Sequence, residues 1–586
     1  MRLVLIICAT IASLSSLQVQ CAALGTQTYC NPLDVEYQYN FEEKWRNISY
    51  RSGADPVIIN HNGEYFLFST IAGGYWHSKD LRNWRHVRPA GWPEQEIVAP
   101  AALSAKGKLF LMPSTYDVRP IYVVSDPAGP NAKLEIFNDK LPYLPGALGP
   151  WDPALFYDPD TDQWFLYVGS SNLFPIYGIE LDEAQKLTYR RAAREMILLR
   201  PELHGWERFG RDHRDTIKPF MEGAWMTKHR GKYYLQYGAP GTEHNVYANG
   251  TYISDKPLGP FTYAPNNPVS YKPGGFVNGA GHGNTFQDNY GNYWNTGTPW
   301  IAVNYDFERR IAMFPAGFDA EGLMFASTRF GDFPQRVPTS KWEKPEDLFS
   351  GWMLLSYRKP AAASSVKYPF AAANITDENP RTFWLAATNR AGEQLTVDLD
   401  RTCEVRAIQI NFTDYKSGLF ASGPEVYTQF LLHHSEDGKT WGTLADLRNE
   451  RRDRPNAYIE LAEPVRARFI RYEHVYVASP NLAISDIRVF GKAEGSLPQV
   501  PPNLRVRRDE DRRNAFLNWE DVPAVVGYNI RWGLRPDKLY QTYQVFGDQR
   551  PQLEIRALTV DQKYSFAIEA FNETGVSRLS EVVSVE

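Results

Sequence analysis

The chain has 586 residues, a net charge of −5 and no block of Lys or Arg, which argues against a nucleic-acid-binding surface. Its length is too great for one ordinary domain, so we expect about three. Aromatic residues make up 14% of the chain, which is typical of β-sheets and also of proteins that stack their rings against sugars.

Residues 1–23 are predicted to be a secretory signal peptide. Arg2 precedes an apolar run from Leu3 to about Leu14, and small residues follow. A lipoprotein signal with an acylated Cys21 is the alternative. The first predicts a secreted or periplasmic protein, and the alternative predicts a lipid anchor at the cell surface. No other apolar run is long enough to span a membrane.

The four cysteines do not form a disulfide framework or a zinc-binding spacing. Cys8 and Cys21 lie in or at the predicted signal, whereas Cys30 and Cys403 fall in different predicted domains. Stability is therefore expected to come from packed cores.

Residues 30–345 repeat a pattern in which a turn with Gly or Asp is followed by a short aromatic strand. The five copies of the pattern begin at Gly63, Gly107, Asp162, Gly231 and Gly291. Another short strand precedes each copy. The repeat predicts five sheets of about four strands each, which is a five-bladed β-propeller.

The strand that precedes each copy begins at an equivalent position in the repeat. These positions are Asp55, Ala99, Asp152, Glu222 and His282. In a propeller they would face a common axis and meet in one small pocket. Because crowded carboxylates cost desolvation and repulsion energy, such a cluster indicates function rather than stability.

The remainder of the chain predicts two β-sandwich domains, over residues 350–492 and 498–586. A Pro-rich linker at residues 495–502 separates them. In the last domain, Trp519 and Tyr564 fit a small Greek-key sandwich with a tyrosine corner. The predicted fold class is therefore all-β, with a five-bladed β-propeller followed by two β-sandwich domains.

Motifs in the first domain resemble those of the family-43 glycoside hydrolases and occur in the same order. SGADPVII, WDPALFYDPDTDQWFLYVG and MEGAWMTKHRGKYYLQYG are similar to the three motifs that carry the family's acidic residues. The resemblance implies that Asp55 is the general base, that Glu222 is the general acid, and that Asp152 tunes the pKa of the acid and orients the substrate.

Two further segments and one departure complete the resemblance. GAGHGNTF implies that His282 lies near a metal ion on the propeller axis, and ERRIAMFPAGFDAEG implies that Arg309 contacts substrate. Many members have Trp-Ala-Pro where this chain has Val98-Ala99-Pro100, so one wall of the pocket is expected to differ. The middle domain resembles a discoidin, or factor V/VIII type C, module, and the last resembles fibronectin type III.

Inverting glycoside cleavage requires an acid and a base about 6.5–9.5 Å apart, so that a water fits between them. Asp55 and Glu222, on different blades, would meet that spacing. We expect Asp152, Phe220 and Trp225 to raise the pKa of Glu222 through repulsion and desolvation.

Each of these residues also has a plainer interpretation. Asp-Pro commonly opens a turn, so Asp55 and Asp152 are distinguished by their matching place in the repeat. Glu222 would otherwise form a buried ion pair with Lys218 or Lys228. His282 would otherwise be a hydrogen-bonded core histidine.

The remaining candidates concern metal and sugar binding. Close to His282, between Gly281 and Gly283, we expect a structural calcium ion held mostly by water. The alternative for Arg309 is an exposed cation on a strand, with Arg310 in its place as the residue that contacts substrate. The remaining aromatic candidates are Trp76 and Phe220 in the pocket, and Trp384, Tyr415 and Phe420 in the middle domain; core packing is their alternative.

The sequence thus predicts a secreted, exo-acting inverting glycosidase that needs no cofactor for its chemistry. The resemblance suggests terminal α-L-arabinofuranose, β-xylose or β-galactose on plant oligosaccharides or polysaccharides. The alternatives are a non-catalytic carbohydrate-binding propeller, for which three intact carboxylates have no use, and a retaining enzyme, whose carboxyl groups would lie about 5–5.5 Å apart.

Overall fold

The structure is a computed structural model that describes residues 27–586 except 94–96, 115–118, 142–143 and 145. The predicted signal peptide lies outside the described residues. Apart from short 3₁₀ helices, the regular structure in the described part is entirely β, which confirms the predicted class. A membrane-crossing helix is absent there, because no helix combines the required length with enough apolar residues.

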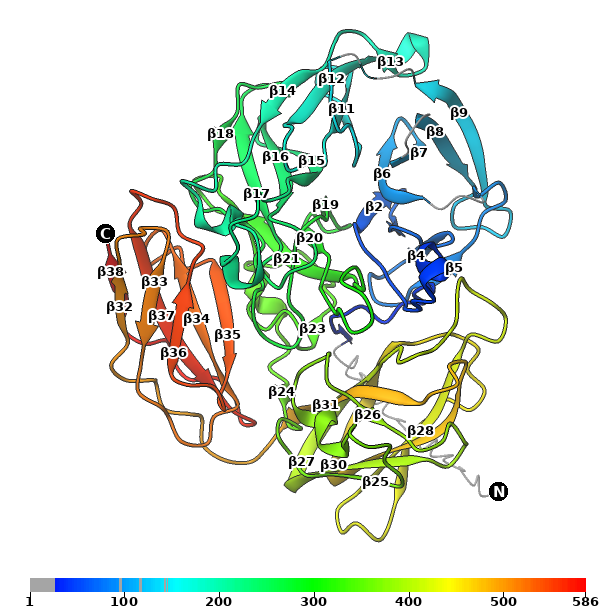
Figure 1. Ribbon diagram of the computed structural model, residues 1–586, viewed down its shortest axis with the longest axis vertical. Helices are drawn as coiled ribbons and strands as arrows, with labels where there is room; N and C mark the ends of the chain where they lie inside the picture. Colours follow the sequence, from blue (N-terminus) through cyan, green and yellow to red (C-terminus); the bar gives the residue numbers. More distant parts are fainter. Residues whose placement is uncertain (1–26, 94–96, 115–118, 142–143, 145) are drawn as a thin grey trace, which may run out of the picture.

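Five antiparallel sheets form the first part of the chain, drawn in blue to green in Figure 1. The sheets are β2 (Val57–His61), β3 (Glu64–Phe68), β4 (Tyr75–Ser78) and β5 (Arg85–Val87); β6 (Val98–Ala105), β7 (Lys108–Ser114), β8 (Arg119–Ser125) and β9 (Lys133–Leu141); β10 (Ala154–Asp158), β11 (Gln163–Val168), β12 (Ile176–Asp182), β13 (Thr188–Tyr189) and β14 (Arg194–Ile197); β15 (Glu222–His229), β16 (Lys232–Ala239), β17 (Ala248–Ser254) and β18 (Thr262–Tyr263); and β19 (Thr285–Gln287), β20 (Tyr293–Gly297), β21 (Ala312–Phe318) and β22 (Met324–Ala326).

The first strands of the five sheets close a ring. β2 contacts β6, β6 contacts β10, β10 contacts β15, β15 contacts β19, and β19 returns to β2. The short pair of β1 (Thr28–Tyr29) and β23 (Gln335–Arg336) joins the two ends of this region. The arrangement is a five-bladed β-propeller.

The inner strands of the blades are largely buried on both faces, which explains why strands such as β3 and β11 are rich in apolar and aromatic residues. In β3, Phe66 and Phe68 pack in one core, while Tyr65 and Leu67 pack in another. Because side chains alternate along a strand, one aromatic strand supplies the cores on both sides of its blade.

The middle domain is one strongly bent sheet with its own apolar core. Its strands are β24 (Met353–Leu354), β25 (Ala361–Ala363), β26 (Trp384–Leu385), β27 (Gln394–Phe412), β28 (Thr428–Ser435), β29 (Gly442–Asp446), β30 (Asn456–Val477) and β31 (Ala483–Lys492). The two longest strands, β27 and β30, pair along most of their length with breaks in register. These breaks let the strands curve around the core.

The last domain is a sandwich of two sheets. One contains β32 (Arg505–Arg508), β33 (Ala515–Asn518) and β36 (Gln552–Ile555); the other contains β35 (Gln541–Phe546), β34 (Gly527–Gly533), β37 (Tyr564–Phe571) and β38 (Val583–Val585). The backbone N–H of Thr559 donates to Tyr564 Oη at 2.9 Å, the hydrogen bond expected of a tyrosine corner.

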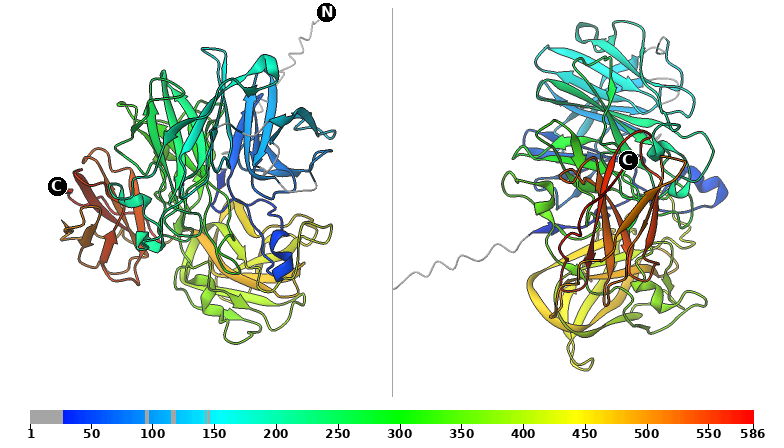
Figure 2. Two further views of the ribbon diagram at one scale, coloured as in Figure 1. Left: turned by 45° about the horizontal axis from the view of Figure 1, so that its top comes forward. Right: turned by 90° about the vertical axis from the view of Figure 1, so that its left-hand side faces the viewer.

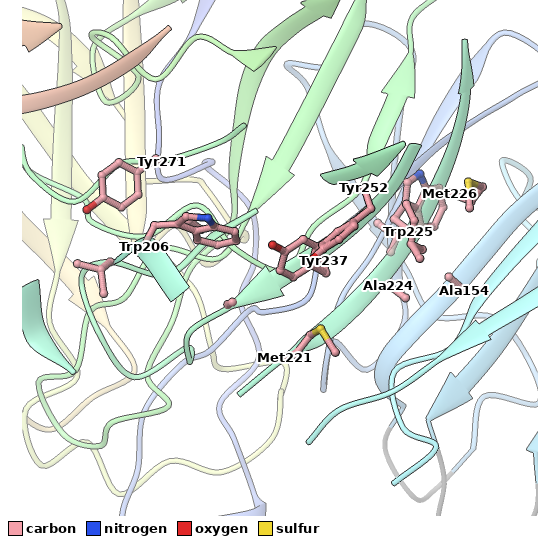
Figure 3. Packing of buried hydrophobic residues seen from close by; sticks show 14 of the residues in the cluster. Ala154, Trp206, Met221, Ala224, Trp225, Met226, Tyr237, Tyr252 and Tyr271 are labelled. Carbon is pink, nitrogen blue, oxygen red and sulfur yellow. The ribbon is translucent and has the colours of Figure 1, made fainter. Parts of the chain in front are cut away.

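The two sandwiches pack against the propeller and against each other (Figure 2). The last sandwich shares a core with the fourth blade, in which Trp206, Tyr237 and Tyr271 lie in a row (Figure 3). The same core holds Met221 and Ala224, on either side of Glu222. Packing therefore anchors the backbone around the predicted general acid.

Candidate active site

An uncommon backbone conformation marks the start of the first strand in every blade. Asp55, Ala99, Asp152 and His282 have φ values of 54°, 39°, 51° and 42°. Such values are rare outside glycine, and their recurrence at one place in the repeat indicates a functional constraint. In the fourth blade the left-handed residue is Gly223, at 61°. Glu222 therefore lies one residue before the repeat position, which corrects the predicted equivalence.

Asp55 is held as an anion on one side of the pocket. His282 Nδ1 lies 3.0 Å from Asp55 Oδ1, and Arg309 Nη1 lies 3.9 Å from the same oxygen. Thr70 Oγ1 donates to Asp55 Oδ2 at 2.5 Å. Burial would raise the pKa of Asp55, but the two cations and the hydrogen bonds lower it well below its ordinary value. Asp55 is thus an ionised carboxylate, the state in which a general base can accept a proton.

Asp152 and Glu222 also lie close to His282, whose Nδ1 is 3.8 Å from Asp152 Oδ2. Potential ligand atoms of these three residues all lie within 4.8 Å of one another. Burial, together with the charges of Glu222 and Asp55, raises the pKa of Asp152 to about 7 against the opposing effect of His282. A pKa shift of the kind expected from crowded carboxylates is thus found at Asp152.

Two hydroxyl groups orient the Glu222 carboxylate. Tyr247 Oη donates to Oε1 at 2.5 Å and Ser170 Oγ donates to Oε2 at 3.1 Å. Glu222 does not form the alternative ion pair predicted with Lys228, because Lys228 binds Asp158 and Asp160 instead.

His282 is a cation at the centre of the acidic group. Burial would lower its pKa, but Asp55, Asp152 and Glu222 raise the pKa to about 9. Its ring lies directly against the fourth blade, because a Cβ on Gly223 would come within 2.6 Å of the ring. Only glycine leaves the space for it.

A calcium site does not follow from these side chains alone. Calcium takes six to eight oxygen ligands, whereas this cluster offers two carboxylates and a ring that holds a proton beside Asp55. The side chains therefore do not form a calcium cage, and an ion near His282 held mostly by water stays a prediction.

The substrate-contact predictions have different outcomes. Arg309 faces Asp55, whereas Arg310 is 2% exposed and binds Asn456 in the middle domain, so the two do not exchange roles. Phe220 is 38% exposed, and its role in the pocket stays a prediction. Trp76 is corrected: it is 1% exposed and packs in the core between blades, where no sugar reaches it.

Four hydroxyl residues that were not predicted from the sequence bind the acidic residues, two at the carboxylate and two at the backbone N–H. Thr70, Ser114, Ser170 and Thr298 each follow or end the second strand of a blade, and each hydrogen-bonds to Asp55, Asp152 or Glu222. The sequence does mark these residues, because four of the repeats end in Ser or Thr: GEYFLFST, GKLFLMPS, DQWFLYVGSS and GNYWNTGT. No comparable pattern marks Tyr247.

Comparison with known proteins identifies two of the domains. Residues 47–323 match the model for glycosyl hydrolases family 43, and residues 360–483 match the model for the F5/8 type C domain. The first of these ranges contains all three acidic residues of the pocket.

Individual relatives match smaller parts of the chain. Xylosidase/arabinosidase 43A of Humicola insolens is 30% identical over 30% of this chain and 60% of its own length. A xylosidase/arabinosidase of Bacteroides ovatus is 47% identical over 8% of this chain and 14% of its own length. A solved glycoside hydrolase structure has a TM-score of 0.45 at 19% identity, covering 75% of this chain and 97% of its own.

Proposed function

We propose that this chain, in which residues 47–323 form a family 43 glycosyl hydrolase domain, is a secreted inverting exo-glycosidase. Its substrates would be plant oligosaccharides or polysaccharides that carry terminal α-L-arabinofuranose, β-xylose or β-galactose. The names of the two relatives favour arabinose and xylose. The observation that carries the proposal is the contrast within one pocket between ionised Asp55 and Asp152, whose pKa is about 7.

In the proposed reaction Glu222 gives a proton to the glycosidic oxygen as the bond from that oxygen to the anomeric carbon breaks. Asp55 accepts a proton from the water that attacks the anomeric carbon from the opposite face. The products are the free sugar with inverted configuration and the shortened glycan.

The neighbouring groups support these two proton transfers. His282 and Arg309 keep Asp55 ionised, so that it is ready to accept a proton. Below about pH 7 Asp152 holds a proton beside the carboxyl group that has to deliver one. Tyr247 and Ser170 fix the orientation of Glu222, and fixed geometry reduces the entropy cost of reaching the transition state.

The test is a screen of 4-nitrophenyl α-L-arabinofuranoside, β-xyloside and β-galactoside with the wild-type protein and Glu222→Gln. We expect the wild type to hydrolyse at least one substrate. On an oligosaccharide with the same terminal sugar, whose leaving group needs a proton, we expect a kcat about 10²–10⁴-fold lower in the variant because general acid catalysis is lost. Glu202→Gln, at an exposed carboxylate paired with Arg200, is the matched control and should keep wild-type rates.

Two results would contradict the proposal. Near-wild-type turnover of the oligosaccharide by Glu222→Gln, with an unchanged unfolding temperature, would exclude Glu222 as the acid. A first-formed sugar that retains its anomeric configuration in a proton NMR time course would exclude the inverting mechanism.

A further inference from the structure

An exposed aromatic ring is held next to the general base. Phe307 is 40% exposed, yet its carbonyl accepts hydrogen bonds from Ser52 Oγ at 3.1 Å and Arg309 Nε at 3.3 Å. The Arg309 guanidinium carbon lies 5.2 Å from the centre of the Phe307 ring, and its Nη1 lies 3.9 Å from Asp55. A fixed backbone therefore presents an apolar ring to solvent one side chain away from the pocket.

Aromatic rings continue from Phe307 towards the middle domain. The Tyr305 ring lies 5.7 Å from the Phe307 ring and 5.6 Å from the ring of buried Tyr50. Ser49, which precedes Tyr50, donates to the carbonyl of Leu419 at 2.5 Å and accepts from its N–H at 2.9 Å. The middle-domain loop that carries Leu419 is thus fastened to the segment leading into Asp55.

This loop presents a second aromatic residue, Phe420. Its backbone is fixed on both sides, because the N–H of Ala421 also donates to the carbonyl of Tyr39 at 2.8 Å. The ammonium group of Lys44 lies 6.0 Å from the Phe420 ring. The next residue, Trp45, is 76% exposed.

We propose that Tyr305, Phe307, Phe420 and Trp45 form an aromatic rim that binds further sugar units of the polymer from which the terminal sugar is cleaved. Sugar rings present C–H faces that stack on aromatic side chains, and their hydroxyl groups suit neighbours such as Lys44. Rings held on a fixed backbone lose little conformational entropy on binding.

The rim rests on the proposed glycosidase function and adds two points to it. It makes the substrate a polymer rather than a free disaccharide, because the rim lies outside the pocket that receives one terminal sugar. It also makes the middle domain part of the substrate-binding surface, since Phe420 belongs to that domain while Phe307 belongs to the propeller.

Binding is tested apart from catalysis in the Glu222→Gln background. Affinity electrophoresis in gels that contain arabinoxylan, arabinan or arabinogalactan measures the retardation of the protein. We expect at least one polymer to retard Glu222→Gln, and Phe307→Ala, Phe420→Ala or Trp45→Ala added to it to weaken the apparent affinity about tenfold, as loss of an aromatic anchor does.

The matched control is Tyr290→Ala in the same background. Tyr290 is 46% exposed and lies in the turn between β19 and β20, at the opposite end of β19 from His282. It should leave the retardation unchanged. Equal retardation of the rim variants and their parent, or retardation by none of the three polymers, would overturn the rim.

A kinetic comparison separates failure of the rim from failure of the proposed function. In the active protein, each rim variant should lower the ratio of kcat/KM on the polymer to kcat/KM on the aryl glycoside about tenfold. An unchanged ratio with normal aryl glycoside hydrolysis would overturn the rim alone. A wild-type protein that binds the polymer through the rim but hydrolyses no glycoside would overturn the proposed function alone.

Discussion

The pocket around Asp55 and the domain interface around Arg51 both bury charged side chains, yet the pKa values of Asp152 in the pocket and Asp414 at the interface shift in opposite directions. Asp152 in the pocket is 8% exposed and Asp414 at the interface is 0% exposed. Burial raises the pKa of Asp152 to about 7. Burial would also raise the pKa of Asp414, but the charges of Arg51 and Arg310 lower it below its ordinary value.

The difference lies in how the charges are paired. At the interface, Arg51 Nε donates to Asp414 at 2.8 Å and its Nη1 donates to Asp453 at 2.9 Å. Arg310 places a second guanidinium 3.8 Å from Asp414. Two cations therefore face Asp414 and Asp453, with Glu308 as a third carboxylate 4.0 Å from Arg310. This network joins the propeller to the middle domain.

Among the described residues of the pocket no guanidinium forms such a close pair, because Arg309 lies 3.9 Å from Asp55 and three carboxylates share the charges of His282 and Arg309. Close guanidinium–carboxylate pairs fasten two domains together, whereas a buried carboxyl group without such a pair retains its proton to higher pH. The comparison implies that pocket substitutions chiefly change rates and that interface substitutions chiefly change stability.

The largest expected effect is on the rate of Asp55→Asn. Asparagine keeps the shape of the side chain and still accepts the Thr70 hydrogen bond, but it cannot accept a proton from water. We expect kcat on the preferred aryl glycoside to fall about 10²–10⁴-fold, with folding retained in thermal unfolding followed by circular dichroism. Asp537→Asn, at an exposed carboxylate in the last domain, is the control. A stable Asp55→Asn variant with full activity would contradict the expectation that pocket substitutions chiefly change rates.

Arg51→Ala should show the opposite behaviour. It leaves Asp414 and Asp453 buried without their main cation, so the free energy of unfolding should fall by about 3–5 kcal/mol. Guanidinium unfolding followed by tryptophan fluorescence measures the change. Arg448→Ala removes an exposed pair with Asp446 and should leave the unfolding curve in place. Equal curves for both variants would show that the interface network contributes nothing to stability.

The next prediction concerns the pH dependence of stability. The pKa of Asp152 is about 7 in the folded protein, against an ordinary value of 3.8. Between these two pH values the folded state therefore binds more protons than the unfolded state. Its contribution to stability is therefore lost as the pH rises through this window. Asp414, whose folded pKa is lowered, contributes stability that is lost as the pH falls.

Asp152→Asn isolates this effect. Between pH 4 and pH 6 the wild type should lose stability as the pH rises, whereas asparagine does not titrate. The unfolding temperature of the variant should therefore rise relative to that of the wild type. This range lies below 6.5, above which the raised pKa of His282 also contributes. Differential scanning calorimetry at several pH values measures the unfolding temperature of the variant minus that of the wild type. A difference that stays constant or falls as the pH rises would contradict the raised pKa of Asp152.

The sequence repeat was sufficient to predict the pocket, because equivalent positions in a propeller must converge on its axis. The positions that it predicted for Asp55, Asp152 and His282 are the ones at which the structure has a left-handed residue. Glu222 is misplaced by one residue, because in its blade Gly223 has this conformation instead. The interface network was beyond such reasoning. Arg51 and Asp414 are 363 residues apart, and no repeated pattern links two positions that meet only when domains dock.

The smallest expected effect is on Thr70→Val, which tests whether the hydroxyl residues at the strand ends position the base. Thr70 Oγ1 donates to Asp55 and accepts from the N–H of Ala99 at 2.8 Å. Valine keeps the shape but makes neither bond. Since a hydrogen bond to a charged group contributes about 1.5–3 kcal/mol, we expect kcat/KM to fall roughly tenfold or more.

The pH profile distinguishes positioning from a general loss of packing. Without the Thr70 hydrogen bond the pKa of Asp55 should rise, which moves the acidic limb of kcat/KM to higher pH. Thr227→Val is the matched control, because the buried Thr227 hydroxyl has no hydrogen-bond partner in the described part of the chain. It should leave both the rate and the pH profile in place. A Thr70→Val variant that behaves like this control would show that Asp55 is oriented by His282 and Arg309 alone.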